Sequence, residues 1–165
     1  KKIILGVANI WATKKGLDDF ISLAKEVAGQ SFQIVMVGLT EGQIEALPAN
    51  ILGIARTENQ AELAEVYSSA DVFFNPTYEE VFGLTNVEAL ACGTPVITYA
   101  SGGSPECVNE KCGYVIGKGE WKKVPALAEQ AKKFNPDGLR AEVLRFDKKL
   151  KYGEYLNLYK KMLNG

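Results

Sequence analysis

Residues 75–97 read NPTYEEVFGLTNVEALACGTPVI, and this stretch decides how the rest of the chain is interpreted. An apolar run that is typical of a strand ends at Asn75, and a helix is predicted over residues 85–92. Gly93 can provide a left-handed C-terminal cap for that helix, and Pro95 prevents its continuation. The stretch therefore predicts a strand, a loop, a short helix and a second strand in close succession.

Two carboxylates flank the loop-to-helix junction in this stretch. Glu80 and Glu88 lie on either side of Gly83, which allows close approach of a ligand to the backbone. A helix N-terminus beside a small residue binds anions, because its free N–H groups and its dipole point outward. Carboxylates suit the hydroxyl groups of sugars. The combination predicts a ligand that carries phosphate and sugar side by side, such as a nucleotide-sugar.

Short apolar runs alternate with amphipathic stretches along the whole chain. The runs are rich in Val and Ile, as expected for strands that are covered on both faces. This alternation predicts an α/β fold of the doubly wound, Rossmann-like type, a parallel sheet of about six strands with helices on both faces. The predicted strands are 3–8, 33–38, 51–55, 71–75, 95–99 and 113–116. The predicted helices are 17–28, 43–47, 61–69, 85–92, 105–109, 124–133, 137–145 and 147–163.

In such a sheet the ligand lies beyond the carboxyl ends of the strands. Four loops are expected to meet there, at 9–16, 56–60, 76–84 and 101–105. The first loop lacks the Gly-x-Gly-x-x-Gly pattern, which disfavours NAD or FAD. Lys15 precedes Gly16 at the start of a helix, where an ammonium group can meet a diphosphate. A lysine that is simply solvated is the alternative interpretation.

Composition sets further bounds on function. A chain of 165 residues with 47% hydrophobic and 24% charged residues is typical of one globular domain. No apolar run reaches the roughly 18 residues of a membrane span. The chain begins with Lys1 and enters a strand at once, so we expect it to be excised from a longer protein. It contains no histidine, which excludes Ser-His-Asp and Cys-His nucleophile systems within the chain.

Charge and cysteine content bear on location and partners. Residues 1–110 carry a net charge of −8 and residues 111–165 a net charge of +7. The basic C-terminal third either faces phosphates or anionic lipid, or consists of solvated helix faces. Three cysteines fit a reducing cytoplasm. We therefore expect a cytoplasmic protein, with peripheral contact at the inner face of the membrane left open, and no nucleic-acid partner.

One structural alternative applies to Glu88. The run Thr85-Asn86-Val87-Glu88 fits the capping-box pattern, in which Thr85 is the N-cap and Glu88 bonds back to its amide. On this interpretation Glu88 stabilises the helix and binds nothing.

Residues 76–106 resemble the signature of the family-4 retaining glycosyltransferases, whose fold is the two-domain GT-B type. Glu80 and Glu88 match the family's pair of glutamates separated by seven residues. Residues 6–16 resemble the opening strand and the Lys-Gly loop of the family. Further matches to the pattern are Phe82-Gly83, Glu88-Ala89, Ala91, Gly93, Pro95-Val96, Gly102-Gly103 and Pro105-Glu106.

The resemblance implies that residues 1–165 form the C-terminal, nucleotide-sugar-binding domain of such an enzyme. The N-terminal acceptor domain is absent from the chain and is the expected partner. The chain is similar to members that build capsular or cell-surface polysaccharide. It departs from the family at Ile10, where an arginine commonly shares the diphosphate with the loop lysine.

The resemblance also assigns roles to individual residues. It implies that Glu80 and Lys15 are catalytic and that Glu88 binds the ribose. No metal cofactor is expected, and the chain has no Asp-x-Asp motif to hold a metal–diphosphate unit. The residues expected to bind the donor sugar and diphosphate are Asn9, Lys15, Phe82, Gly83, Leu84 and Thr85, and those expected near the base are Ile54 and Arg56.

These expectations combine into one function and two alternatives. The intact protein is expected to be a hexosyltransferase-type glycosyltransferase that moves a sugar from a nucleotide-diphosphate sugar to a glycan or lipid-linked acceptor. The isolated domain is expected to be inactive, because the reaction takes place between the two halves of the fold. The first alternative is a non-catalytic nucleotide- or sugar-binding module. The second is a GT-B epimerase, against which the absence of histidine counts.

Overall fold

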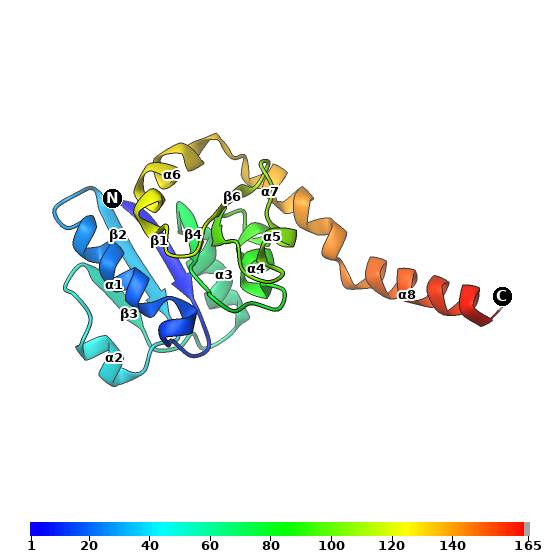
Figure 1. Cartoon of the computed structure of the whole chain (residues 1–165), viewed down its shortest axis with the longest axis horizontal. Helices are drawn as coiled ribbons and strands as arrows, with labels where there is room; N and C mark the ends of the chain where they lie inside the picture. Colours follow the sequence, from blue (N-terminus) through cyan, green and yellow to red (C-terminus); the bar gives the residue numbers. More distant parts are fainter. Residues whose placement is uncertain (164–165) are drawn as a thin grey trace.

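The computed structural model describes residues 1–163 and shows one six-stranded sheet in which every pair of neighbouring strands is parallel (Figure 1). The strand order is β3-β2-β1-β4-β5-β6. This confirms the predicted doubly wound, Rossmann-like α/β sheet of about six strands. The strands are β1 Lys2–Val7, β2 Phe32–Val37, β3 Ile51–Ile54, β4 Val72–Asn75, β5 Val96–Tyr99 and β6 Gly113–Ile116.

Helices cover both faces of the sheet. Side chains of α1, α2 and α6 pack on one face, and side chains of α3, α4, α5 and α7 pack on the other. The α-helices are α1 Leu17–Glu26, α2 Glu41–Glu45, α3 Gln60–Ser68, α4 Leu84–Ala91, α5 Ser104–Cys107, α6 Val124–Gln130, α7 Pro136–Val143 and α8 Lys148–Leu163. Short 3-10 turns lie at Thr13–Lys15, Trp121–Lys123, Ala131–Lys133 and Leu144–Phe146.

The alternation of side chains along each strand divides the core into two layers. In β1, Ile4 packs with the α1 side of the sheet and its neighbour Leu5 packs with the α3 and α4 side, and both are fully buried. Burial of each such side chain contributes roughly 1.5–3 kcal/mol. Strands that are apolar on both faces suit the interior of a sheet, and β2, β1, β4 and β5 lie between the edge strands β3 and β6.

The topology places a crevice at one point of the sheet. The chain runs outward from β1 to β2 and β3, and then returns to β4 on the other side of β1. Beyond the carboxyl ends of β1 and β4 the connecting segments diverge, and such switch points are where open α/β sheets bind ligands.

Several helix boundaries differ from the prediction by two or three residues, and α2 is shifted at both of its ends. The sequence placed this helix at 43–47, whereas it begins at Glu41 after the N-cap Thr40. The Thr40 hydroxyl accepts from the Gln43 amide, and the Gln43 side chain accepts from the Thr40 amide. This capping box starts the helix two residues earlier than its apolar pattern indicates.

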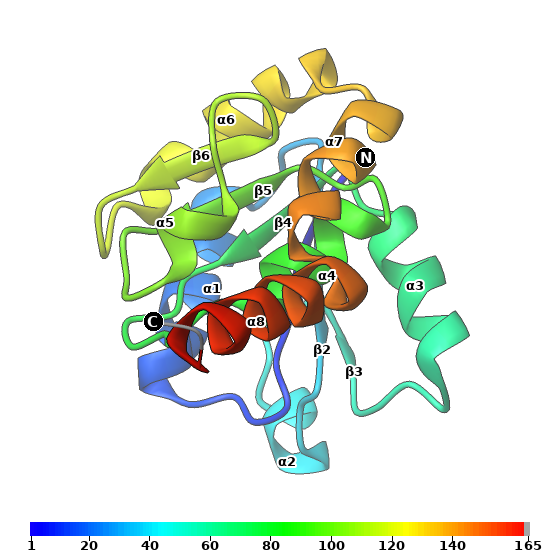
Figure 2. The ribbon, with the colours of Figure 1, turned by 90° about the vertical axis from the view of Figure 1, so that its right-hand side faces the viewer.

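The C-terminal helix α8 projects from the body of the molecule in Figure 1, and in Figure 2 it lies in front of the body, on the side that faces the viewer. No helix among residues 1–163 has both the length and the apolarity needed to cross a bilayer. Several large apolar side chains of α8 are nevertheless at least half exposed, namely Leu150, Tyr152, Tyr155, Leu156, Leu158, Tyr159, Met162 and Leu163.

Candidate functional site

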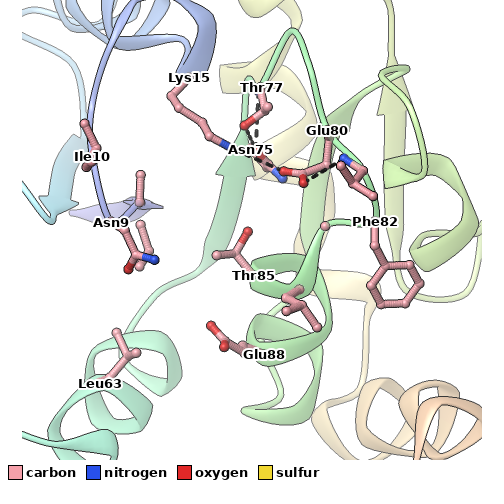
Figure 3. A pocket seen from close by; sticks show the side chains of 15 residues that line it. Asn9, Ile10, Lys15, Leu63, Asn75, Thr77, Glu80, Phe82, Thr85 and Glu88 are labelled. Carbon is pink, nitrogen blue, oxygen red and sulfur yellow. Dashed lines mark hydrogen bonds and ion pairs between the residues drawn. The ribbon is translucent and has the colours of Figure 1, made fainter.

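A cavity of about 660 Å³ lies beyond the carboxyl ends of β1 and β4 (Figure 3). It is bounded by the loop after β1, the loop after β4, the first turns of α4, and Leu63 of α3. The lining residues are Val7, Ala8, Asn9, Ile10, Lys15, Leu63, Asn75, Thr77, Glu80, Val81, Phe82, Gly83, Leu84, Thr85 and Glu88. The switch point of the sheet therefore carries a concave site of ligand size.

A second cavity of about 500 Å³ adjoins the first. The two share Val7, Ala8, Asn9 and Leu63, and the second extends to the segment 55–60, which includes Arg56. The shared residues show that the two cavities lie side by side, and together they are called the cleft below. Three of the four loops expected to meet at this edge of the sheet, 9–16, 56–60 and 76–84, do line this cleft.

Lys15 and Glu80 meet in the first cavity although 65 residues separate them in the sequence. The Lys15 Nζ lies 3.5 Å from the Glu80 Oε2, and the side chains are 34% and 17% exposed. The other carboxylate oxygen of Glu80 accepts from the Val81 amide at 3.0 Å. Both charged groups are therefore held at the cavity wall, with the ammonium group open to an incoming anion (Figure 3).

The N-terminus of α4 opens into the same cavity. Its N-cap is Gly83, whose φ of 91° lies in the left-handed region. A Cβ at this position would also lie 2.8 Å from the Asn86 side-chain nitrogen, so glycine suits the site on two grounds. Within residues 1–163 the amides of Leu84 and Thr85 have no hydrogen-bond acceptor. They are available to an anion.

The capping-box alternative for Glu88 is wrong. Thr85 lies inside α4, because Gly83 takes the N-cap position with no side-chain bond. Glu88 is exposed, lines the first cavity, and accepts at Oε2 a hydrogen bond of 3.1 Å from the Tyr67 hydroxyl. The left-handed conformation of Gly83 moves the helix start and frees both side chains from the pattern that the local sequence predicted.

A buried chain of polar side chains supports the cavity from below. The Thr77 hydroxyl donates to the Asn75 side-chain oxygen at 2.7 Å, and the Asn75 amide donates to the Asn86 oxygen at 2.9 Å. The Asn86 amide donates to the Ser104 hydroxyl at 3.4 Å. All four residues are at most 5% exposed. The chain joins β4, the loop after it, α4 and α5, and buried polar groups linked in this way make the local structure unique and stiff.

The glycine pair Gly102-Gly103 does not line the cleft. It packs against the loop that carries Glu80, where the Gly103 amide donates to the Glu80 carbonyl at 3.4 Å. A Cβ on Gly102 would lie only 1.6 Å from that carbonyl oxygen. The glycines therefore allow the turn at 102–103 to press against the backbone of Glu80 and Val81.

We predict that Gly102→Ala lowers the free energy of unfolding by about 1–3 kcal/mol, because its φ of +50° is unfavourable for a side chain. It should also weaken ligand binding, since the displaced loop carries Glu80. Thermal unfolding and calorimetry measure the two effects. Gly42→Ala, in α2 with open space at the Cβ position, is the control and should not weaken binding. A stable Gly102→Ala variant would contradict the packing argument.

The remaining predicted residues are placed as follows. Asn9 lines both cavities, and Arg56 lines the second. Phe82 borders the first cavity, but its ring turns away and packs edge-on against Phe146 with centroids 5.4 Å apart (Figure 3). Ile54 lines neither cavity and packs with the α3 and α4 side of the core.

Sequence reasoning missed the residues that hold the site in place. Asn75 and Thr77 line the cavity, while Tyr67, Asn86 and Ser104 lie behind it. An asparagine at the end of an apolar strand signals a turn, and this was the one local sign of the network. The partners of Tyr67 and Asn86 are distant in sequence and only the fold identifies them.

The Cys107 thiol is poorly suited to nucleophilic chemistry, and the described residues form no metal-binding cluster. Burial raises the pKa of Cys107 to about 11, and its thiol donates to the Phe82 carbonyl. A thiol with a raised pKa is a poor nucleophile. Within residues 1–163 no three His, Cys, Asp or Glu side chains gather as a metal-binding set.

Comparison with known families gives a match over most of the chain. Residues 1–134 match the family described as "Glycosyl transferases group 1". A D-inositol 3-phosphate glycosyltransferase of Actinosynnema mirum is 36% identical over 89 residues, which cover 47% of this chain and 21% of that protein. The same enzyme of Mycolicibacterium vanbaalenii is 49% identical over 53 residues, which cover 32% and 12%.

Solved structures share the fold. Sucrose-phosphate synthase of Thermosynechococcus elongatus matches with a TM-score of 0.80 at 22% identity, over 99% of this chain and 46% of that one. A glycosyltransferase of Rickettsia africae gives 0.82 at 20%, over 98% and 48%. Anabaena HepE, solved with UDP-glucose, gives 0.76 at 19%, over 96% and 49%. The chain thus spans about half the length of these GT-B-like structures.

Proposed function

This chain belongs to the glycosyl transferases group 1 family, and on that premise we propose that residues 1–165 bind the nucleotide-sugar donor of a family-4 retaining glycosyltransferase. The proposal makes the chain the C-terminal half of a GT-B enzyme. Its ligand would be a nucleotide-diphosphate sugar, held in the cleft beyond β1 and β4.

The order of chemical groups along the cleft carries this proposal. In the first cavity Lys15 and Glu80 lie at one end and Glu88 at the other, with Thr85 of the α4 N-terminus between them (Figure 3), and the adjoining second cavity extends to Arg56. A nucleotide-sugar presents sugar, diphosphate, ribose and base in the same order. Each part of it then meets a suitable group: a carboxylate for the sugar, an ammonium and free amides for the diphosphate, and a second carboxylate for the ribose.

The chemical step follows from charge stabilisation. As the bond from the sugar to the diphosphate breaks, negative charge develops on the phosphate. Lys15 and the preorganised amides of Leu84 and Thr85 would stabilise that charge with no metal in the site. The departing phosphate itself would take the acceptor proton, so a protein base such as histidine is not required. Glu80 would position the transferred sugar, and the proposed outcome is retention of the anomeric configuration.

The proposal includes a second domain, which would carry the acceptor site. The similar structures are about twice as long as this chain, and we assign the acceptor site to an N-terminal domain. Ile10, Val81 and Leu84 expose 77%, 93% and 66% of their surface at the rim of the cleft, and an opposing domain would cover such apolar groups. The acceptor is proposed to be a glycan or a lipid-linked sugar on the cytoplasmic side, in the synthesis of cell-surface polysaccharide.

Calorimetric titration of this chain with UDP, GDP, ADP, CDP and dTDP and their hexose derivatives tests the proposal. One nucleotide series should bind, and Glu88→Gln should weaken its binding by about 1.5–3 kcal/mol, the range for a hydrogen bond to a charged group. Glu65→Gln, an exposed carboxylate of α3 outside both cavities, is the matched control and should bind as the wild type does. If none of these nucleotides or nucleotide-sugars binds, the proposal is wrong.

One observation favours a different function. Ile10 stands exposed at the diphosphate end of the cleft, in the position where the family commonly has a second cation. The lack of a second cation at this position is consistent with a non-catalytic nucleotide- or sugar-binding module. Binding of the free nucleotide, with no transfer by the intact protein, is the result that would identify such a module.

A further inference from the structure

The hydroxyl of Tyr67 reaches the carboxylate of Glu88 from inside the core. Tyr67 lies in α3 and is 1% exposed, whereas Glu88 lies in α4 and is exposed to the cleft. The O–H of Tyr67 donates to Glu88 Oε2 at 3.1 Å. We infer that Tyr67 is a positioning residue that orients Glu88 toward the ribose hydroxyls. The inference rests on the proposed function, because it concerns the same ligand.

The surroundings of Tyr67 hold its hydroxyl in one place. Its ring packs edge-on against Phe73 of β4, with centroids 5.5 Å apart and planes at 71°. The Tyr67 carbonyl accepts from the Thr94 hydroxyl at 2.6 Å, which ties the end of α3 to the loop after α4. A tyrosine has only two flexible torsions, so contacts at the ring and at the backbone are sufficient to place its oxygen.

The direction of this hydrogen bond is set by charge. Burial raises the pKa of Tyr67 far above its ordinary value, and the nearby negative charge of Glu88 raises it further. The phenol therefore stays protonated and donates, and the carboxylate accepts. Among residues 1–163 the other oxygen of Glu88 makes no hydrogen bond, so it is available to a ligand.

A held carboxylate differs from a free one in how it binds. An exposed glutamate on a helix samples several rotamers, and a ligand that fixes one of them must offset the lost entropy. Tyr67 removes part of this cost before the ligand arrives. The gain in affinity applies only to ligands whose hydroxyls contact Glu88. A general structural role of Tyr67 would instead affect the binding of every ligand.

The test uses the nucleoside diphosphate that binds best in a panel of UDP, GDP and ADP, together with its 2′-deoxy and 3′-deoxy forms. The wild type should prefer the ribose form. Tyr67→Phe removes only the hydroxyl, and we expect it to weaken binding of the ribose form by roughly three- to tenfold, the range for one hydrogen bond. Its affinity for the deoxy form that has lost the Glu88 contact should change little, so the preference shrinks.

Tyr99→Phe is the matched control. Tyr99 is fully buried in β5 and also donates to a carboxylate, Asp19 Oδ2 at 2.7 Å, but it lies outside both cavities. This variant should keep the preference for ribose. In a Glu88→Gln background, Tyr67→Phe should have no further effect on that preference, because the charged acceptor is gone.

The outcomes separate the two proposals. A wild type that binds none of the panel contradicts the proposed function. A wild type that prefers ribose, combined with a folded Tyr67→Phe variant that keeps both affinity and preference, overturns the positioning role. Equal weakening of the ribose and deoxy forms also overturns it, since that result marks a general loss of structure.

Discussion

Lys15→Ala is expected to weaken binding of a nucleoside diphosphate by about 1.5–3 kcal/mol, the range for a hydrogen bond to a charged group. Lys15 lines the first cavity beside Glu80, at the end where we propose that the sugar and diphosphate bind. Its removal also leaves the carboxylate of Glu80 without its ion-pair partner and facing the diphosphate. Calorimetry with the nucleotide selected from the panel measures the change.

The adjacent lysine provides a matched control. Lys14 is 68% exposed, pairs with Glu79 at the surface at 3.8 Å, and lies outside both cavities. Lys14→Ala should therefore bind nearly as the wild type does. Wild-type affinity should fall as salt rises, because part of the attraction is between partly exposed charges. Equal losses of nucleotide affinity in the two variants would show that binding depends on the overall charge of the chain and not on the position of Lys15.

The second large effect concerns transfer. The intact parent protein should form product, whereas the 165-residue chain alone should form almost none. Holding donor and acceptor in the reacting geometry can supply roughly 7–11 kcal/mol of a barrier, and one half of a cleft forfeits much of that contribution. A product assay on the chain, with and without the N-terminal half of the same parent, measures the difference.

Donor affinity is the control for this comparison. The cleft is built from this chain's own loops, so the isolated chain should bind the nucleotide with an affinity close to that of the parent. Equal affinity with unequal transfer would assign the loss to the missing acceptor. Full transfer by the chain alone would show that it is not half of an active site.

The architecture could be predicted because its signals are local. Each strand is an apolar run, and the end of α4 is predicted by Gly93 and Pro95. Gly93 adopts a φ of 83°, and its amide donates to the Leu90 carbonyl at 3.0 Å while that of Thr94 donates to Ala89 at 2.9 Å. This pattern is the Schellman cap that a glycine after a helix predicts.

The start of α4 could not be predicted in the same way. Thr85 and Glu88 have capping-box spacing, but the loop enters the helix through a left-handed glycine at Gly83. A Cβ on Gly83 would lie 2.8 Å from the Asn86 side chain and 3.2 Å from the Ser104 hydroxyl, and these neighbours come from α4 itself and from α5. Local sequence favoured a cap that the tertiary structure replaced.

The residues that line the cavity could be predicted from the sequence, whereas the buried residues that hold them in place could not. Lys15, Glu80 and Glu88 belong to recognisable motifs, and the fold brings all three to one cavity. The buried residues act through hydrogen bonds between side chains that are distant in sequence, such as Tyr67 with Glu88 and Asn86 with Ser104. No local pattern marks a buried tyrosine as the partner of a carboxylate on a neighbouring helix.

A crystal structure of this chain with the nucleoside diphosphate selected by calorimetry tests the central claim most directly. We predict a diphosphate between the Lys15 ammonium and the amides of Leu84 and Thr85, with ribose hydroxyls on Glu88 and the base in the cavity beside Arg56. A nucleotide bound elsewhere, with this cleft empty at saturating ligand, would contradict it.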